Sequence, residues 1–181
     1  YRGARQPGGV GRVFGGQVIA QALQAAQRSV DGGKEAHSLH AYFMRAGNED
    51  FPIIYRVVRD FDGKSFANRR IIAMQQGQPI LNMTASFQLP EPGMAHQDAM
   101  PDVPPPEALK SEAVLRAEMG DRIPEKFRKF FLRARPIEIR PVAVRDWFAP
   151  EKLPPVQHGW FRVAAPLPDD PALHRAMLSS A

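Results

Sequence analysis

Four strand-like segments follow one another in the first half of the chain, separated only by short turns. They span residues 37–45, 51–61, 65–76 and 80–88. In the fourth segment apolar and polar side chains alternate without interruption, which is typical of a strand with one buried face. Asp62-Gly63 and Gly77-Gln78-Pro79 supply the turn signals between segments. A helix followed by a run of hairpins predicts an α+β fold with an antiparallel sheet, and it excludes an alternating βαβ arrangement.

One helix is predicted before these strands, from Gly15 to about Ser29. It is rich in alanine, and its apolar residues recur at helical spacing. They are Val18, Ile19, Ala22, Leu23, Ala26 and Val30. Gly32-Gly33 ends the segment, as glycine commonly does just past a last helical turn. A helix with so many small side chains is thin, which suits close packing inside a curved sheet.

The second half of the chain begins with a proline-rich stretch. Prolines at 90, 92, 101, 104, 105 and 106 disfavour both helix and central strand. Two short helices are predicted over 107–119 and 123–134, and strands over 136–147 and 159–165. Asp169-Asp170-Pro171 then predicts a helix start. We therefore expect a first module at 1–89, a proline-rich linker with short helices at 90–135, and the start of a second module at 136–181.

Composition excludes several classes of protein. The chain has no cysteine, so neither a disulfide nor a cysteine nucleophile is available. No apolar run approaches the length of a membrane-spanning helix, and the opening residues predict no signal peptide. The net charge is +5, but the basic residues are spread out, which predicts no nucleic-acid partner. A denser basic zone at 122–145 would also suit a phosphorylated small ligand, and charge alone leaves this open.

Several blocks of sequence resemble the acyl-CoA thioesterase II (TesB-type) family, in the order in which that family has them. They are Arg12 to Leu23, His37 to Arg45, Pro52 to Tyr55, Gly63 to Arg70 and Pro79 to Gln88, with a looser likeness at Ile137 to Pro141 and Leu173 to Leu178.

This resemblance implies a double hot-dog fold, in which each module is a long helix wrapped by a curved antiparallel sheet. The second module is expected to be incomplete, and both ends of the chain are expected to be cut from a longer protein. The implied activity is hydrolysis of fatty acyl-CoA to free acid and CoA. CoA is then part of the substrate, and no cofactor is expected. A homo-oligomer is implied, with a cytoplasmic location in bacteria or a peroxisomal one in eukaryotes.

The resemblance also implies a catalytic Asp, Thr and Gln in the second module. The family places all three beyond the position of Ala181. None of them is therefore assigned to a residue of this chain, which alone is expected to be inactive unless other groups do the chemistry.

Four residues of the chain itself are candidates for thioester chemistry. Gly15 and Gly16 lie at a predicted helix start, where exposed N–H groups could stabilise an oxyanion. Gln17 could hold a water or donate to a carbonyl, and His40 has a side chain suited to a general base. Each also has a purely structural explanation. Gly15 and Gly16 would fit a tight strand-to-helix turn, Gln17 would be an ordinary polar residue in a first turn, and His40 would be a hydrogen-bonded structural histidine. The remaining histidines have no metal-ligand spacing, so no metal is predicted.

Two alternative functions remain open at this point. A hot-dog hydratase would require a paired Asp and His, and no such pair is evident from the sequence. A non-catalytic acyl-CoA-binding module would need only the first module. A serine hydrolase is disfavoured because Ser86 lacks the Gly-x-Ser-x-Gly context.

Overall fold

The structure is a computed structural model that describes residues 1–4, 11–146 and 148–181. Trp147, with which one predicted strand ends, lies outside the described residues. Contacts between residues divide the chain into two compact units. Unit 1 comprises Tyr1–Met94 together with Pro168–Ala181, and unit 2 comprises Ala95–Leu167.

Unit 1 is built around a five-stranded antiparallel sheet with the strand order β1-β3-β4-β5-β2. Its strands are β1 (Arg2–Gly3), β2 (Glu35–Phe43), β3 (Ile53–Asp62), β4 (Phe66–Gln75) and β5 (Gln78–Gln88). The four predicted strands are confirmed, and the short β1 adds a fifth beside β3.

The turn between β4 and β5 is tighter than the sequence predicts. Gln76 and Gly77 alone form it, with φ of 48° and 75°. Positive φ at both central residues matches the right-handed twist of the flanking strands. Pro79 consequently lies within β5, where it pairs with Met74 next to an irregularity in register. Proline is tolerated near the start of a strand or at a bulge, because its missing N–H is then not needed by the ladder.

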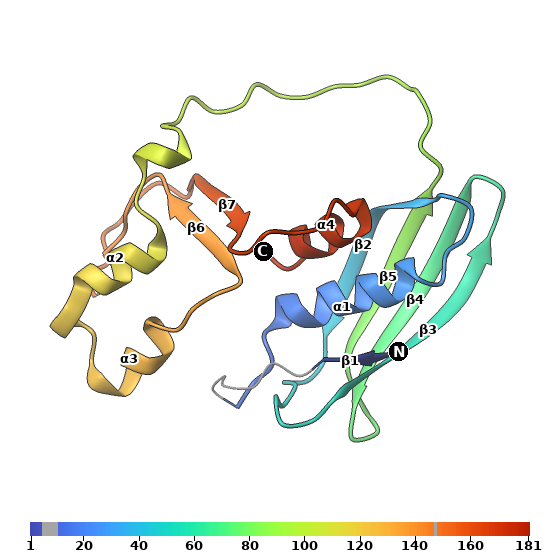
Figure 1. Ribbon diagram of the computed structural model, residues 1–181, viewed down its shortest axis with the longest axis horizontal. Coiled ribbons are helices and arrows are strands. Elements are labelled where there is room, and N and C mark those ends of the chain that lie inside the picture. Colours follow the sequence, from blue (N-terminus) through green and yellow to red (C-terminus); the bar gives the residue numbers. More distant parts are fainter. Residues whose placement is uncertain (5–10, 147) are drawn as a thin grey trace. The chain divides into compact units, whose positions relative to one another are not determined.

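Helix α1 (Gly15–Gln27) lies along one face of this sheet, as Figure 1 shows. Its predicted stripe is largely buried, with Ala22 and Ala26 fully inaccessible. The alternation in β5 is also confirmed, because Leu81 and Phe87 are both 0% exposed. Small side chains on the helix let its axis approach the sheet closely, so the larger residues of β4 and β5 fill the space between them.

Strand β2 has an apolar face that is only partly buried. Of the three residues that share that face, Ala41 is partly buried, but Leu39 and Phe43 are exposed. Strand β2 is the edge strand beyond β5, so its side chains have a strand neighbour on one side only. Alternation identifies the residues that share a face, but it does not say what covers that face.

Helix α4 (Pro171–Leu178) packs beside α1 in the opposite direction. Its predicted start is confirmed, because the Asp170 carboxylate accepts hydrogen bonds from N–H groups of the first turn. Near that start, Gln27 Nε2 donates to the Ala172 carbonyl at 3.0 Å. At the other end, a side chain added at Gly16 would lie 2.3 Å from the Ser180 carbonyl oxygen. The two helices therefore approach each other closely where α1 begins.

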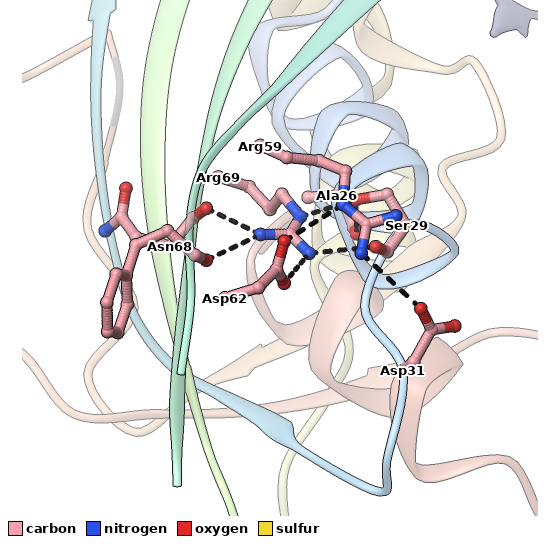
Figure 2. Close-up of polar contacts among 8 residues, drawn as sticks. Ala26, Ser29, Asp31, Arg59, Asp62, Asn68 and Arg69 are labelled. Atoms are coloured by element: carbon pink, nitrogen blue, oxygen red, sulfur yellow. Dashed lines mark hydrogen bonds and ion pairs between the residues drawn. The ribbon is translucent and has the colours of Figure 1, made fainter. Parts of the chain in front are cut away.

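The C-terminal end of α1 is tied to the β3–β4 hairpin by a buried arginine, Arg69, which is 0% exposed (Figure 2). Its Nε and Nη2 donate to the hydroxyl and the carbonyl of Ser29, both at 2.9 Å. Nη1 donates to the carbonyls of Phe61 and Asn68, and Nη2 also contacts Asp62 Oδ1 at 2.5 Å. A guanidinium has five N–H donors, so this buried group is fully satisfied. We call this arrangement the Arg69 clamp.

The carboxylate of the clamp is shared with a second arginine. Arg59 Nε donates to Asp62 Oδ2 at 3.0 Å, and Arg59 also lies 3.5 Å from the Asp31 carboxylate. The hydrogen bond from Arg69, followed by that from Arg59, lowers the pKa of the Asp62 carboxyl below its ordinary value. Asp62 is thus held ionised. Its negative charge compensates the positive charge of the buried guanidinium.

Unit 2 is smaller and contains a two-stranded antiparallel sheet with helices. Its elements are η1 (Pro106–Ala108), α2 (Glu112–Met119), η2 (Gly120–Arg122), α3 (Glu125–Phe131), β6 (Ile137–Pro141) and β7 (Gly159–Val163). Both predicted helical stretches and both predicted strands are present, the strands shorter than expected. Residues 168–181, expected to belong to the second module, fall within unit 1. The predicted extents of the two modules stay predictions, since a compact unit need not coincide with a module.

Candidate functional site

Helix α1 begins without the groups that normally occupy a helix start. Phe14 is the N-cap residue, it is extended (φ −67°, ψ 130°), and it offers no side-chain cap. The first turn also contains no acidic residue. The first N–H groups of an α-helix have no partner within the helix, and the helix dipole places about half a positive charge there. The start of α1 can therefore attract a negative or polarised oxygen.

A pocket of about 400 Å³ opens at this helix start, and we call it the α1 pocket. Its walls come from the start of α1, the end of β2, the start of β5 and the loop after β2. The lining residues are Val13, Gly15, Val18, Phe43, Met44, Arg45, Ala46, Gly47 and Ile80. Most of them are apolar, and among them only Arg45 carries a charge. Such a pocket suits an apolar chain that ends in a polar or anionic group.

Backbone hydrogen bonds attach the loop wall of the pocket to β5 and to the residue two before α1. Met44 N donates to the Ile80 carbonyl at 2.9 Å, and Val13 N donates to the Gly47 carbonyl at 2.9 Å. Arg45 is exposed, but its Nη1 donates to the Pro79 carbonyl at 2.9 Å. The single cation of the pocket is therefore held near the pocket instead of ranging freely in solvent.

The structure places the two predicted glycines differently. Gly15 lines the α1 pocket, and a side chain there would meet the ring of Phe43 at 2.9 Å. Gly16 faces the end of α4, because an added Cβ would lie 2.3 Å from the Ser180 carbonyl. Close helix packing is thus a sufficient reason for glycine at position 16. Gly15 remains a candidate for substrate or oxyanion contact, and neither role is tested by the structure.

Gln17 is not among the residues that line the pocket. Its Nε2 donates to the Ala4 carbonyl at 3.1 Å, and Gln21 Nε2 donates to the same oxygen at 3.1 Å. The Tyr55 hydroxyl donates to Gln21 Oε1 at 2.9 Å, so these side chains fasten the N-terminal segment to α1 and β3. The predicted role of Gln17 in catalysis stays a prediction, while its observed contact is structural.

His40 lies on the outer face of the sheet, away from α1. Its neighbours along β2, Leu39 and Ala41, point the other way, and its cross-strand partner is Thr84 of β5. The ring of His40 makes an edge contact with that of Tyr42, with centroids 4.7 Å apart. The structure therefore separates His40 from Gly15 by the thickness of the sheet. Its proposed role as general base is untested, but it would not act within the α1 pocket of the same chain.

Sequence reasoning missed most of the pocket. Met44 ends the strand-like part of the His37 to Arg45 block and Ala46 follows that block, but neither is singled out by the sequence as a candidate for binding. The sequence offered only weak signals. The alternation of apolar and polar residues stops at Arg45, and Gly47 indicates a turn or loop after the strand. A pocket whose walls come from separated segments becomes visible only when the fold brings those segments together.

A larger pocket, of about 870 Å³, lies within unit 2 between α2 and the β6–β7 sheet. Its charges are balanced: three arginines and three carboxylates line it, with Arg122 contacting Asp146 at 2.5 Å and Arg116 paired with Glu112. This lining gives no preference for a ligand of one charge.

Across the described ranges, no three or more His, Cys, Asp or Glu side chains gather as a metal site would require. The predicted absence of a metal stays a prediction. In those same ranges no helix has the length and apolar character needed to cross a membrane.

A helix packed along one face of an antiparallel sheet is the arrangement of the hot-dog class of α+β proteins. A protein of unknown function from Alicyclobacillus acidocaldarius, described as having a hot-dog fold, superimposes with a TM-score of 0.64 at 22% identity. That match covers 94% of this chain and 59% of the other. The predicted fold class is therefore confirmed.

Relatives of higher identity bear on the family. The family model described as "Acyl-CoA thioesterase N-terminal domain" matches residues 4–88. Acyl-CoA thioesterase 2 of Haemophilus influenzae is 37% identical over 99% of this chain and 63% of its own length. The crystal structure of acyl-CoA thioesterase II TesB2 from Mycobacterium marinum matches with a TM-score of 0.71 and 38% identity, over 99% of this chain and 61% of that one. These matches support the predicted TesB-type acyl-CoA thioesterase II family for this chain, which spans about three fifths of the length of these two relatives.

Proposed function

We propose that this chain carries the acyl-CoA-binding part of a thioester hydrolase and that the α1 pocket receives the acyl thioester. The observation that carries the proposal is the apolar pocket at the uncapped start of α1. This pocket is built largely from residues inside the region that the thioesterase family model matches. The names of the relatives, acyl-CoA thioesterases, supply the substrate class.

The chemistry follows from the nature of the substrate. Water attacks the thioester carbonyl carbon, and the carbonyl oxygen becomes an oxyanion in the tetrahedral intermediate. The carbon–sulfur bond then breaks, the acid leaves, and the CoA sulfur takes up a proton. N–H groups at the start of α1, near Gly15, would stabilise the oxyanion through hydrogen bonds and the helix dipole. The apolar walls would hold the acyl chain in place.

Arg45 gives the pocket a bias toward the CoA part of the substrate. CoA carries phosphate groups, and Arg45 is the single charged residue among the described residues that line the pocket. Its hydrogen bond to the Pro79 carbonyl keeps the guanidinium close by. A fixed cation at a pocket attracts an anionic ligand and raises its rate of association. We therefore propose that Arg45 contributes to binding and not to the chemical step.

A second candidate is an acyl-CoA-binding module that does not catalyse hydrolysis. No Asp, Glu or His occurs among the described residues that line the α1 pocket, so these residues offer no general base there. The same observation disfavours a hot-dog hydratase, which needs a paired Asp and His. Turnover would in that case need groups that this pocket does not contain.

Binding and turnover are tested separately. Isothermal titration calorimetry measures the affinity for a medium-chain acyl-CoA and for CoA alone. Release of free thiol measures hydrolysis, and the protein adds no thiol background because it has no cysteine. Ala46→Trp should fill the pocket from its exposed rim and lower acyl-CoA affinity about tenfold or more. Ala95→Trp, at an exposed position that lines no described pocket, is the matched control.

The outcomes separate the two candidates. Acyl-CoA affinity that is equal in the wild type and Ala46→Trp would overturn the assignment of the α1 pocket. Binding without thiol release would support the binding module, whereas thiol release would support the hydrolase. If thiol release persists in His40→Ala, His40 is not the general base. The predicted homo-oligomer and cytoplasmic location stay predictions.

A further inference from the structure

Gln75 is a buried amide that none of the chemistry above uses. It is the last residue of β4, and only 6% of it is exposed. Its Oε1 accepts a hydrogen bond from Asn48 N at 2.8 Å. Its Nε2 donates to the carbonyls of Asn48 at 2.7 Å and Phe51 at 2.9 Å. Both amide N–H donors and the amide oxygen are therefore engaged by one short stretch of the loop between β2 and β3.

The backbone that carries Gln75 is held in a fixed position. Gln75 pairs with Gln78 across the two-residue turn formed by Gln76 and Gly77, and that turn has positive φ at both residues. A two-residue hairpin turn of this type fixes strand register. The side chain is thus presented from a rigid hairpin end, whereas the residues it binds lie in a loop.

The loop that Gln75 binds continues directly into the wall of the α1 pocket. Residues 44–47 line the pocket, and Asn48 follows them. At Gly47 an added Cβ would lie 3.3 Å from Gln75 Oε1, which places the amide against the back of the wall. Asp50 N also donates to Asn48 Oδ1 at 2.8 Å, so the stretch bound by Gln75 is braced internally. The wall is held at one end by Met44 N on the Ile80 carbonyl, and at the other by Val13 N on the Gly47 carbonyl and by Gln75 on Asn48.

We infer that Gln75 is a positioning residue for the α1 pocket: it holds the 44–47 wall in the arrangement that admits the acyl group of an acyl-CoA. This inference rests on the proposed function of that pocket. Gln75 is absent from the described residues that line the pocket, so it acts through the loop and does not touch the ligand. A loop ordered before binding loses less conformational entropy when the ligand arrives, which raises affinity.

The inference predicts which part of the ligand is affected. The wall contacts the pocket interior, where the acyl chain would lie, so its disorder should weaken acyl recognition. Arg45 belongs to the wall, but its backbone N–H and its guanidinium are bonded to the Ile80 and Pro79 carbonyls of β5 and not to Gln75, so it would still attract the CoA part. Loss of Gln75 should therefore reduce the difference in affinity between acyl-CoA and CoA.

Gln75→Leu tests this, with Gln21→Leu as the matched control. The substitution at 75 keeps a similar size but removes all three hydrogen bonds to the loop. The same substitution at 21 removes the bonds to Tyr55 and to the Ala4 carbonyl, away from the pocket wall. The probe is a medium-chain acyl-CoA analogue in which a thioether replaces the thioester, titrated by calorimetry alongside CoA alone. Hydrogen–deuterium exchange of residues 44–51 reports the order of the wall.

We expect Gln75→Leu to bind the analogue about tenfold more weakly, to bind CoA as the wild type does, and to exchange the 44–51 amides faster. Gln21→Leu should match the wild type in all three. Should Gln75→Leu fail to fold, Gln75→Glu replaces it: that side chain keeps an acceptor for Asn48 N but cannot donate to the two carbonyls.

Three results would overturn the inference. They are wild-type affinity in Gln75→Leu, unchanged exchange at 44–51 despite weaker binding, and equal losses in Gln75→Leu and Gln21→Leu. Failure of the wild type itself to bind the analogue would instead defeat the proposed function, and with it the role of Gln75 in acyl binding. Exchange would then still decide whether Gln75 orders the wall.

Discussion

Helix α1 joins the rest of unit 1 in two different ways at its two ends. At the C-terminal end, the Arg69 clamp satisfies every donor of a buried guanidinium and joins the helix end to the β3–β4 hairpin. At the N-terminal end, Phe14 provides no side-chain cap, and the first turn opens on the α1 pocket.

This difference separates stability from binding. Polar groups at the clamped end have hydrogen-bond partners within the protein. They stabilise the fold and offer little hydrogen-bonding capacity to a ligand. At the open end, the N–H groups of the first turn have no partner within the helix and no side-chain cap, so they can serve a substrate oxygen. The predictions below break or sharpen this contrast, from the largest expected effect to the smallest.

Replacing the buried guanidinium should have the largest effect. Arg69→Met removes five hydrogen bonds and leaves the carbonyls of Ser29, Phe61 and Asn68 without that partner. We expect a loss of about 3 kcal/mol in the free energy of unfolding, measured by urea denaturation. Arg56→Met, the same substitution at an exposed position of β3, is the control and should change stability little. A loss below about 0.5 kcal/mol for Arg69→Met would show that the clamp is dispensable.

The two glycines at the open end should differ in their response to alanine. Gly16→Ala places a methyl group 2.3 Å from a backbone carbonyl of residue 180, and backbone cannot easily move aside. We expect it to destabilise the protein by about 2 kcal/mol. Gly15→Ala meets only the ring of Phe43, an exposed side chain that can rotate away, and should be close to neutral. Thermal unfolding compares the two variants, and a greater loss for Gly15→Ala would contradict the observed packing.

The pH dependence of the clamp should be the smallest effect. The folded-state pKa of Asp62 lies below its unfolded value, so its contribution is present above the unfolded pKa and is lost as pH falls through the folded pKa. Asp62→Asn should therefore be less stable than the wild type at pH 7, and the difference should shrink in strongly acidic buffer. Asp31→Asn, at a side chain 88% exposed, is the control. A difference that grows on acidification would reverse the sign and refute the assignment.

Much of unit 1 follows from sequence pattern. The predicted helix from Gly15 to about Ser29 is observed as Gly15–Gln27, and the fourth predicted strand is observed as Gln78–Gln88. These elements are regular and have one buried face, so periodicity alone identifies them. The predicted fold and family rest on the same segments, together with the order in which they occur.

The rest depends on contacts that periodicity does not encode. Arg69 is in phase with the buried residues Ile71 and Ala73 of β4, but an arginine in such a pattern is normally exposed. Only its five acceptor atoms, two on Ser29 just after α1 and three on the hairpin, make burial favourable. Likewise Phe43 shares the inward face of β2 and yet is exposed, because β2 is an edge strand. Of the predicted site, Gly15 reaches the pocket, whereas His40 is on the other side of the sheet.

The partnership of α1 with α4 has a consequence for the order in which the molecule is completed during synthesis. Unit 1 takes its residues from 1–94 and from 168–181, whereas unit 2 occupies the continuous stretch between them. A ribosome delivers α1 and its sheet early, but the carbonyl of residue 180 that lies against Gly16 emerges more than 160 residues later. Closing so long a loop is slow compared with forming local contacts. Unit 2 can therefore fold before unit 1 is complete. Until the later segment arrives, the flank of α1 that receives α4 stays uncovered.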